Sequence, residues 1–266
     1  MGVIEMGSGL SERYTTQAEA ANDPVYLALR LLHGRACEIL SEIHVLLASG
    51  HPNGARARWR TLHELSVYAI LIYEHGEELA ERYLDYCHIE DLADIRASGE
   101  PIPHELAELR DQLRQQYGKL YCKPGGWAAI LGPADAKRPP DFAELERLAQ
   151  LADRRTNYKS ANHGVHAGSR MAWNGLVTRG QDTILAVGST NAGLALPGIL
   201  ALETFFQLSG YLLVYGWEKT RDVMFILTAT ALAPIVEEAT AAFIEAEEQV
   251  AKAEAAFLAA NGNTIY

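Results

Sequence analysis

Residues 53–76 read NGARARWRTLHELSVYAILIYEHG, and this stretch decides the fold. It begins rich in arginine and becomes almost wholly apolar between Leu65 and Tyr73. A helix that is apolar on all sides lies at the centre of a protein, since none of its faces can be left to water. Asn53-Gly54 begins the stretch and Gly76 ends it, so we predict a central helix over these residues.

The flanking sequence predicts further helices on both sides. Asp23-Pro24 is typical of a helix start, and apolar residues recur at helical spacing from there until Gly50. Further helices are expected at 77–98, 104–117, 141–155, from about 196, and at 220–260, the last kinked or split at Pro234. The segment 119–140 is rich in proline and glycine, so we expect an irregular loop with Trp127 packed back on the body.

These elements define the expected fold class. We predict an all-α protein, a single-domain bundle of about seven to eight helices. The only strand candidate is a small β-hairpin near 177–189, around the apolar run 184–188. Residues 1–22 are expected to form a disordered N-terminal lead, and residues 23–262 the helical domain.

Composition and charge exclude several function classes. Hydrophobic residues make up 48% of the 266 residues, which is enough for a sizeable core and excludes intrinsic disorder. Lys and Arg number 23 against 34 Asp and Glu, so the net charge of −11 disfavours a bulk nucleic-acid-binding surface. Three scattered cysteines (Cys37, Cys87 and Cys122) and a start without a secretory pattern favour a reduced, cytoplasmic setting.

The stretch from Gly193 to Gly216 is long and apolar enough to raise the question of a membrane span. Pro197, Glu203 and Gln207 interrupt it, and a glutamate in mid-span costs about 2–4 kcal/mol. We therefore favour a buried core helix and expect no membrane interaction.

A first polar cluster lies where the central helix begins. Arg60 and Glu64 are four residues apart and can pair, while Arg56, Arg60 and His63 share one face. One interpretation is an internal salt bridge that orients the helix. The other is a local basic patch that binds an anion or a phosphate, helped by the free N–H groups of a helix N-terminus.

A second polar cluster is the stretch from Tyr158 to Arg170. His163 and His166, three residues apart, could ligate a metal ion together with Glu203 from the long apolar helix. The simpler interpretation is a pair of hydrogen-bonded structural histidines. Gly164 and Gly168 are costly inside a helix, so we expect them to permit the close approach of a neighbouring helix or a ligand.

Two acidic features complete the candidates. Glu203 lies inside an apolar run and should be paired, with Arg60, His166 or Lys219 as candidate partners, or have a raised pKa. The acidic stretch 237–248 is most simply a solvated face or an oligomer contact. The sequence contains no P-loop, nucleophile elbow or dinucleotide-binding glycine motif, so no cofactor is implied.

The first cluster is similar to the Arg-x(4–6)-His pattern of the HEPN (higher eukaryotes and prokaryotes nucleotide-binding) ribonucleases. The matches are Arg56 and Arg58 with His63, and Arg82 with His88. In that family, arginine and histidine lie at one helix end, and two such helices meet across a dimer to bind the scissile phosphate. This resemblance implies a phosphate-binding arginine and a proton-transferring histidine.

Several stretches together resemble a bacterial family, domain of unknown function 5677. They are 54–64 with Arg60-Thr61-Leu62-His63-Glu64, 158–167 with Tyr158-Lys159 and Val165-His166-Ala167, and 188–194 ahead of the long apolar helix. The resemblance implies a helical bundle in which Arg60, Glu64, Tyr158 and His166 lie together. Asn162 stands where the family more commonly has a serine. This resemblance implies no established activity.

The observations leave three functional hypotheses. The first is a ribonuclease-like toxin or phage-defence effector, with catalytic residues Arg60, His63, Glu64, Tyr158 and His166 and ligand-binding residues Arg56, Asn162, His163 and Glu203. The second is a non-catalytic binding or scaffold protein whose polar cluster is structural. The third is a metal-dependent enzyme using His163, His166 and Glu203. The expected partners are RNA or a phosphate-containing ligand at the basic patch, and a second copy or another protein.

Overall fold

The computed structural model describes residues 22–166, 169, 173, 176–179, 182–185 and 187–261. The predicted disordered lead, except for Asn22, lies outside these residues. The described chain is all-α, as predicted, and falls into two compact units. Within the described residues, one unit comprises 32–66 and the chain from 153 onward, and the other comprises 22–31 and 67–152. The sequence alone did not predict this division.

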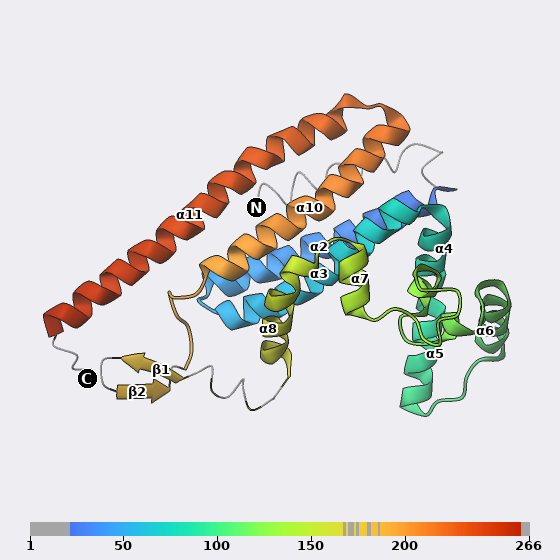
Figure 1. The fold of residues 1–266 in the computed structure, drawn as a ribbon, viewed down its shortest axis with the longest axis horizontal. Coiled ribbons are helices and arrows are strands. Elements are labelled where there is room, and N and C mark those ends of the chain that lie inside the picture. The colour runs from blue at the N-terminus through green and yellow to red at the C-terminus, as the bar shows by residue number, and fades with distance from the viewer. Residues whose placement is uncertain are drawn as a thin grey trace. The chain divides into compact units, whose positions relative to one another are not determined.

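Nine α-helices account for most of the described residues (Figure 1). They are α2 (Pro24–Ala48), α3 (Pro52–His75), α4 (Glu77–Asp85), α5 (Cys87–Ser98), α6 (His104–Tyr117), α7 (Phe142–Leu148), α8 (Arg155–Val165), α10 (Ala195–Thr220) and α11 (Val223–Asn261). Two short strands, β1 (Leu176–Arg179) and β2 (Asp182–Leu185), pair antiparallel with Val177 opposite Ile184.

Helices α2 and α3 each contribute residues to both units. Asp23 caps α2, because its Oδ1 accepts the backbone N–H of Tyr26 at 3.0 Å. The apolar side chains that recur along α2 are buried, as are Trp59, Leu62, Val67 and Ile70 of α3. This confirms α3 as a buried helix between Pro52 and His75, within a residue or so of the predicted ends.

The predicted single helix 77–98 is wrong, since the chain forms α4 and α5 with a break at Tyr86. The N–H of Tyr86 bonds to Tyr83 O, a tighter turn than the α-helical one, and its hydroxyl donates to Lys123 O at 2.6 Å. A tyrosine anchored in this way to another segment fixes the break. Its apolar spacing alone did not reveal this.

The segment 119–140 is less irregular than predicted. It holds two 3₁₀ helices, Lys119–Cys122 and Gly126–Leu131, and buries Tyr121 and Trp127. The expectation that Trp127 packs back on the body is confirmed. The backbone at Gly126 lies against the carbonyls of Leu120 and Tyr121, where a Cβ would clash. The two short helices thus anchor the segment in the core of its unit, while much of the rest of it is exposed.

Helix α7 starts as predicted and ends early. Asp141 and Glu144 form a reciprocal capping box at its start. The helix ends at Leu148, and Gln150 adopts a left-handed backbone with φ of 58°. A new helix, α8, begins at Arg155, where the sequence analysis expected the previous one to end.

Helices α10 and α11 pack side by side and antiparallel (Figure 1). The ring of Phe243 lies over Gly198 and that of Phe225 over Gly216, where any Cβ would meet the ring. Two glycines of α10 thus let two aromatic rings of α11 approach its backbone. The alternative of a split at Pro234 is wrong, since α11 runs through this residue as one helix.

Both α10 and α11 are long and apolar enough to cross a membrane by length and composition. This criterion is weak evidence, because core helices of soluble proteins also meet it. One face of α10 is buried in its unit, in keeping with the predicted core helix. In α11, most of the apolar 18-residue stretch that meets this criterion is not buried.

Candidate functional site

Three of the predicted site residues meet in a closed polar cluster. Arg60 Nη2 lies 2.9 Å from Glu64 Oε1 and donates to the Tyr158 hydroxyl oxygen at 2.8 Å. The Tyr158 hydroxyl in turn donates to Glu64 Oε1 at 2.5 Å. Helix α3 supplies the first two residues at i and i+4, and α8 supplies the third. Each of the three thus bonds to the other two.

The Tyr158 hydroxyl is held in its protonated form within this cluster. Burial, followed by the hydrogen bond to the Glu64 carboxylate, raises the pKa of the Tyr158 hydroxyl. The phenol therefore stays protonated near neutral pH and cannot act as a base there. The guanidinium of Arg60 also lies over the Tyr158 ring, 5.0 Å from its centroid. The arginine charge is paired with Glu64 inside the cluster, while its buried Nε has no hydrogen-bond partner among the described atoms.

His63 lies beside the cluster and is completely buried, with 0% of its surface exposed. Its ring stacks on Trp59 at a centroid distance of 5.3 Å and tilts against Tyr158 at 5.8 Å. A histidine that transfers protons to a substrate must reach that substrate. This side chain is sealed from solvent.

Glu203 differs from the prediction of a carboxylate in an apolar environment. Its side chain is 47% exposed and lies 3.9 Å from Arg154 Nη2. The expected partners Arg60, His166 and Lys219 are thus replaced by Arg154, which also donates to Thr204 Oγ1 at 3.0 Å. The apolar periodicity predicted helix α10 correctly, but the sequence could not show that Glu203 faces solvent.

The histidine segment is less regular than predicted. Helix α8 ends at Val165, and His166 follows with extended backbone and an exposed side chain. His163 and His166 therefore do not project from one helix face. Among the described residues, no three His, Cys, Asp or Glu side chains form a metal-binding group, so His163, His166 and Glu203 do not converge.

The remaining predicted positions, in and after α8, lie outside the cluster of Arg60, Glu64 and Tyr158. Gly164 faces α3, where a Cβ would lie 3.4 Å from Asn53 O, an ordinary contact, so this approach does not require a glycine as the sequence predicted. Gly168 lies outside the described residues. Asn162 has a buried amide oxygen without a hydrogen-bond partner among the described atoms. Of the four residues that the family resemblance placed together, His166 makes no described side-chain bond to the other three.

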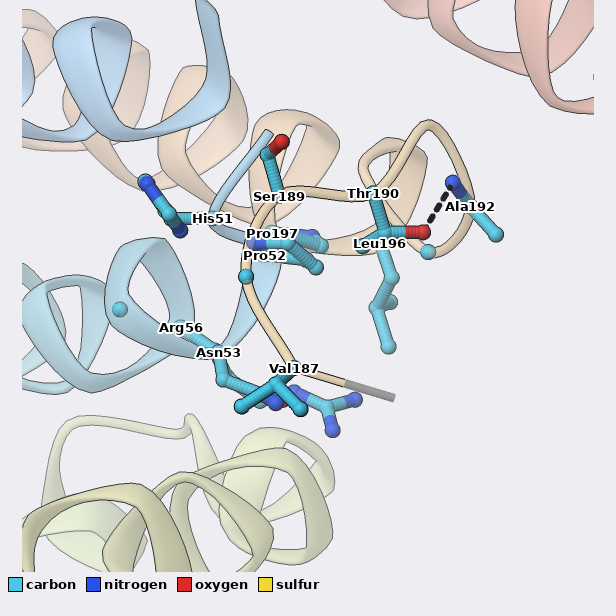
Figure 2. Close-up of a pocket in the computed structure, with 13 residues that line it drawn as sticks. His51, Pro52, Asn53, Arg56, Val187, Ser189, Thr190, Ala192, Leu196 and Pro197 are labelled. Carbon is cyan, nitrogen blue, oxygen red and sulfur yellow. Dashed lines mark hydrogen bonds between the residues drawn. The ribbon is translucent and has the colours of Figure 1, made fainter. Parts of the chain in front are cut away.

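A pocket of about 480 Å³ lies at the N-terminal end of α3 (Figure 2). One wall is the turn between α2 and α3, and the other is the segment that leads into α10. The lining residues are His51, Pro52, Asn53, Gly54 and Arg56, with Val187, Gly188, Ser189, Thr190, Ala192, Gly193, Leu196 and Pro197. None of these carries a carboxylate, in a chain whose net charge is −11.

The loop wall is held in place from two sides. The N–H of Thr190 donates to Gly50 O at 2.8 Å. Gly50 has φ of +76°, and a Cβ there would lie 2.9 Å from Ser189 Cβ, so only glycine fits the turn. From α11, Glu247 accepts the backbone N–H groups of Gly193 at 2.9 Å and Ala195 at 3.3 Å.

Arg56 carries the positive charge of this pocket. Its Nη1 donates to Ser160 Oγ at 3.3 Å, and its buried Nε, like those of Arg58 and Arg60, has no hydrogen-bond partner among the described atoms. Within the described part of the chain, Arg58 pairs with Glu42 and Arg60 with Glu64, whereas no carboxylate pairs with Arg56. Figure 2 draws its guanidinium beside Val187, which also lines the pocket.

Sequence reasoning identified Arg56 and missed the loop opposite it. The stretch Gly188-Ser189-Thr190-Asn191-Ala192-Gly193 was visible as part of the family resemblance. Its glycines and hydroxyls were the available signal for a binding loop. The sequence could not show that this loop docks on the start of α3.

Comparison with known proteins places the chain in a family. No curated protein and no solved structure matches it. The sequence model of the family of unknown function DUF5677 matches residues 26–183. Because that match covers more than half of the chain, the protein belongs to the DUF5677 family.

Proposed function

We propose that this protein is a non-catalytic binding protein whose ligand is a small organic phosphate held in the pocket at the start of α3. The observation that carries the proposal is Arg56, a guanidinium on the wall of an open cavity with no carboxylate partner among the described residues. An unpaired, partly desolvated guanidinium favours an anionic ligand, and phosphate suits its forked geometry.

The rest of the pocket supports the same class of ligand. The helix α3 begins at Pro52 without an acidic residue in its first turn, so its positive dipole end is not neutralised there. Ser189 and Thr190 line the opposite wall, and the Thr190 hydroxyl accepts the N–H of Ala192 at 3.1 Å (Figure 2). Leu196 and Val187 add apolar surface for a sugar or base, and about 480 Å³ is in the range of small-molecule sites.

The geometry weighs against the ribonuclease hypothesis. That hypothesis assigns proton transfer to His63 or His166. The first is fully buried, and the second has no described contact with Arg60, Glu64 or Tyr158. The three clustered residues satisfy one another, which is typical of a group that stabilises the fold.

Ligand binding is tested by isothermal titration calorimetry with pyrophosphate and with adenosine 5′-monophosphate at low salt. We expect the wild type to bind the nucleotide, and Arg56→Gln to weaken binding by about tenfold or more through loss of a charge-assisted bond. Arg58→Gln is the matched control, because Arg58 lies on the same helix, pairs with Glu42 and does not line the pocket.

Two results would overturn the proposal. One is equal affinity of the wild type and Arg56→Gln for every phosphate that binds. The other is cleavage of added RNA by the wild type that is abolished in His63→Ala. That result would support the ribonuclease hypothesis.

A further inference from the structure

The second half of α11 buries little of its surface. No side chain between residues 237 and 260 is buried, whereas Phe225, Leu232 and Val236 in the first half are. A helical segment with so little buried surface opens locally at a small cost in free energy. The contacts that this half makes with α10 therefore determine how firmly it docks.

Two side chains of this half contact the start of α10. The ring of Phe243 lies over Gly198, where a Cβ would be 2.5 Å from its Cζ. One helical turn later, the Glu247 carboxylate accepts two backbone N–H groups, that of Gly193 at 2.9 Å and that of Ala195 at 3.3 Å. Residues four apart share one face of a helix, so the two contacts form together. We call Phe243 and Glu247 the α11 strap.

The backbone that the α11 strap holds is also a wall of the pocket. Gly193, Leu196 and Pro197 line the pocket (Figure 2). Glu247 does not line it, so the strap contacts this wall without entering the cavity. The docking of the strap and the position of the wall are therefore linked.

We propose that the α11 strap regulates the affinity of the pocket, because its docking orders the wall that the ligand contacts. This inference rests on the proposed phosphate ligand. A ligand that contacts the ordered wall favours the docked form, so the free energy of docking enters its apparent affinity. The coupling is reciprocal, and anything that pulls the strap from α10 weakens ligand binding by the factor by which the ligand tightens the strap.

The sign of the effect distinguishes a strap from a nearby charge. Glu247 is a carboxylate close to a pocket that is proposed to bind an anion. If it acted only through its charge, its removal would strengthen the binding of that anion. If it acts as part of the strap, its removal frees the N–H groups of Gly193 and Ala195, loosens the wall and weakens binding.

The coupling is tested with Glu247→Ala, titrated calorimetrically with adenosine 5′-monophosphate at low salt. Alanine favours the helix, so the variant removes the carboxylate without weakening α11 itself. We expect the dissociation constant to rise about fivefold or more. Glu248→Ala is the matched control, because Glu248 is exposed, pairs with Lys252 and carries the same charge at the next position. Its dissociation constant stays the same or falls slightly.

Amide hydrogen exchange of the ligand-free protein tests the strap independently of any ligand. The wild type protects the amides of Gly193 and Ala195, and Glu247→Ala makes both exchange about tenfold faster because their acceptor is lost. The amides of α3 exchange at the same rate in both proteins, which verifies that the variant is folded.

The outcomes separate a failure of the strap from a failure of the proposed function. If the wild type binds adenosine 5′-monophosphate, an unchanged or lower dissociation constant in Glu247→Ala overturns the coupling and leaves the proposed ligand in place. Unchanged exchange of Gly193 and Ala195 in that variant overturns the strap itself. A wild type that binds neither pyrophosphate nor the nucleotide overturns the proposed function and the coupling with it.

Discussion

Arg56 and Arg60 lie one helical turn apart on α3, but only Arg60 is paired with a carboxylate. Arg60 is bonded to Glu64 and Tyr158, which are bonded to each other. Arg56 donates to one serine hydroxyl and lines an open cavity. The same residue type, at equivalent positions of one helix, is held in the first case by a carboxylate and has none in the second. The partner determines which arginine supports the fold and which can bind a ligand.

The comparison also separates stability from binding. Changes in the closed cluster should lower the free energy of unfolding, because they leave a polar group without its partner. Changes at the pocket should lower ligand affinity and leave stability nearly intact.

The largest effect is expected for Glu64→Ala. Removing the carboxylate leaves Arg60 without its counter-charge and Tyr158 without its acceptor. The cost is about 2–3 kcal/mol, below the value for a fully buried pair because the side chains of Arg60 and Glu64 are 27% and 23% exposed. Urea denaturation measures this free energy. A loss as small as that of a surface substitution would show that the cluster does not support the fold.

His33 is a third polar side chain that differs from both arginines, because it is buried and uncharged near neutral pH. Burial lowers its pKa from 6.5 to about 4, and it lies 3.2 Å from Ser209 Oγ. Between these two pH values the unfolded chain binds a proton at His33 that the folded chain does not, so stability falls as pH falls through this window. We expect a loss of about 2 kcal/mol from pH 7 to 4.5.

The contribution of His33 is isolated by comparing urea denaturation of the wild type and His33→Gln over this pH range. The variant should lose less stability on acidification, because carboxylate titration remains and the histidine contribution is gone. Parallel curves for the two proteins would contradict the assignment.

A smaller effect is expected for Tyr158→Phe. The ring remains over Arg60 and against His63, while the hydroxyl that joins Arg60 to Glu64 is removed. Since the ion pair persists, the cost is about 1 kcal/mol, typical of one hydrogen bond. Thermal unfolding monitored by circular dichroism measures it. A cost equal to that of Glu64→Ala would mean that the hydroxyl, and not the ion pair, holds the cluster together.

The smallest effect on stability is expected for Arg56→Gln, within about 0.5 kcal/mol, because only a long hydrogen bond to Ser160 is lost. The same denaturation assay measures it. An unfolding free energy reduced as much as in Glu64→Ala would remove the distinction between the two arginines.

The sequence predicted the parts of the fold that depend on local pattern. Apolar spacing and end signals at Asp23, Gly50 and Gly76 located α2 and α3, and the i, i+4 spacing predicted the pairing of Arg60 with Glu64. It failed where a distant segment decides the local structure. The break at Tyr86 depends on Lys123, and the exposure of Glu203 depends on which face of α10 meets its neighbours.

The candidate site was predictable only in part for the same reason. The cluster combines two neighbouring residues of α3 with Tyr158, which the family resemblance supplied. The pocket combines Arg56 with a loop more than 130 residues away, docked through Gly50 and Glu247. Nothing local to either segment indicates that they meet.

The central claim is that the pocket at the start of α3 binds an organic phosphate, and its most direct test is a two-dimensional amide NMR titration with adenosine 5′-monophosphate. We predict that the amide signals of Gly54, Gly188 and Gly193 shift together in a saturable manner, while that of Tyr158 stays in place. Saturable shifts around Tyr158 with none at the three glycines, or no shifts at all, would contradict the claim.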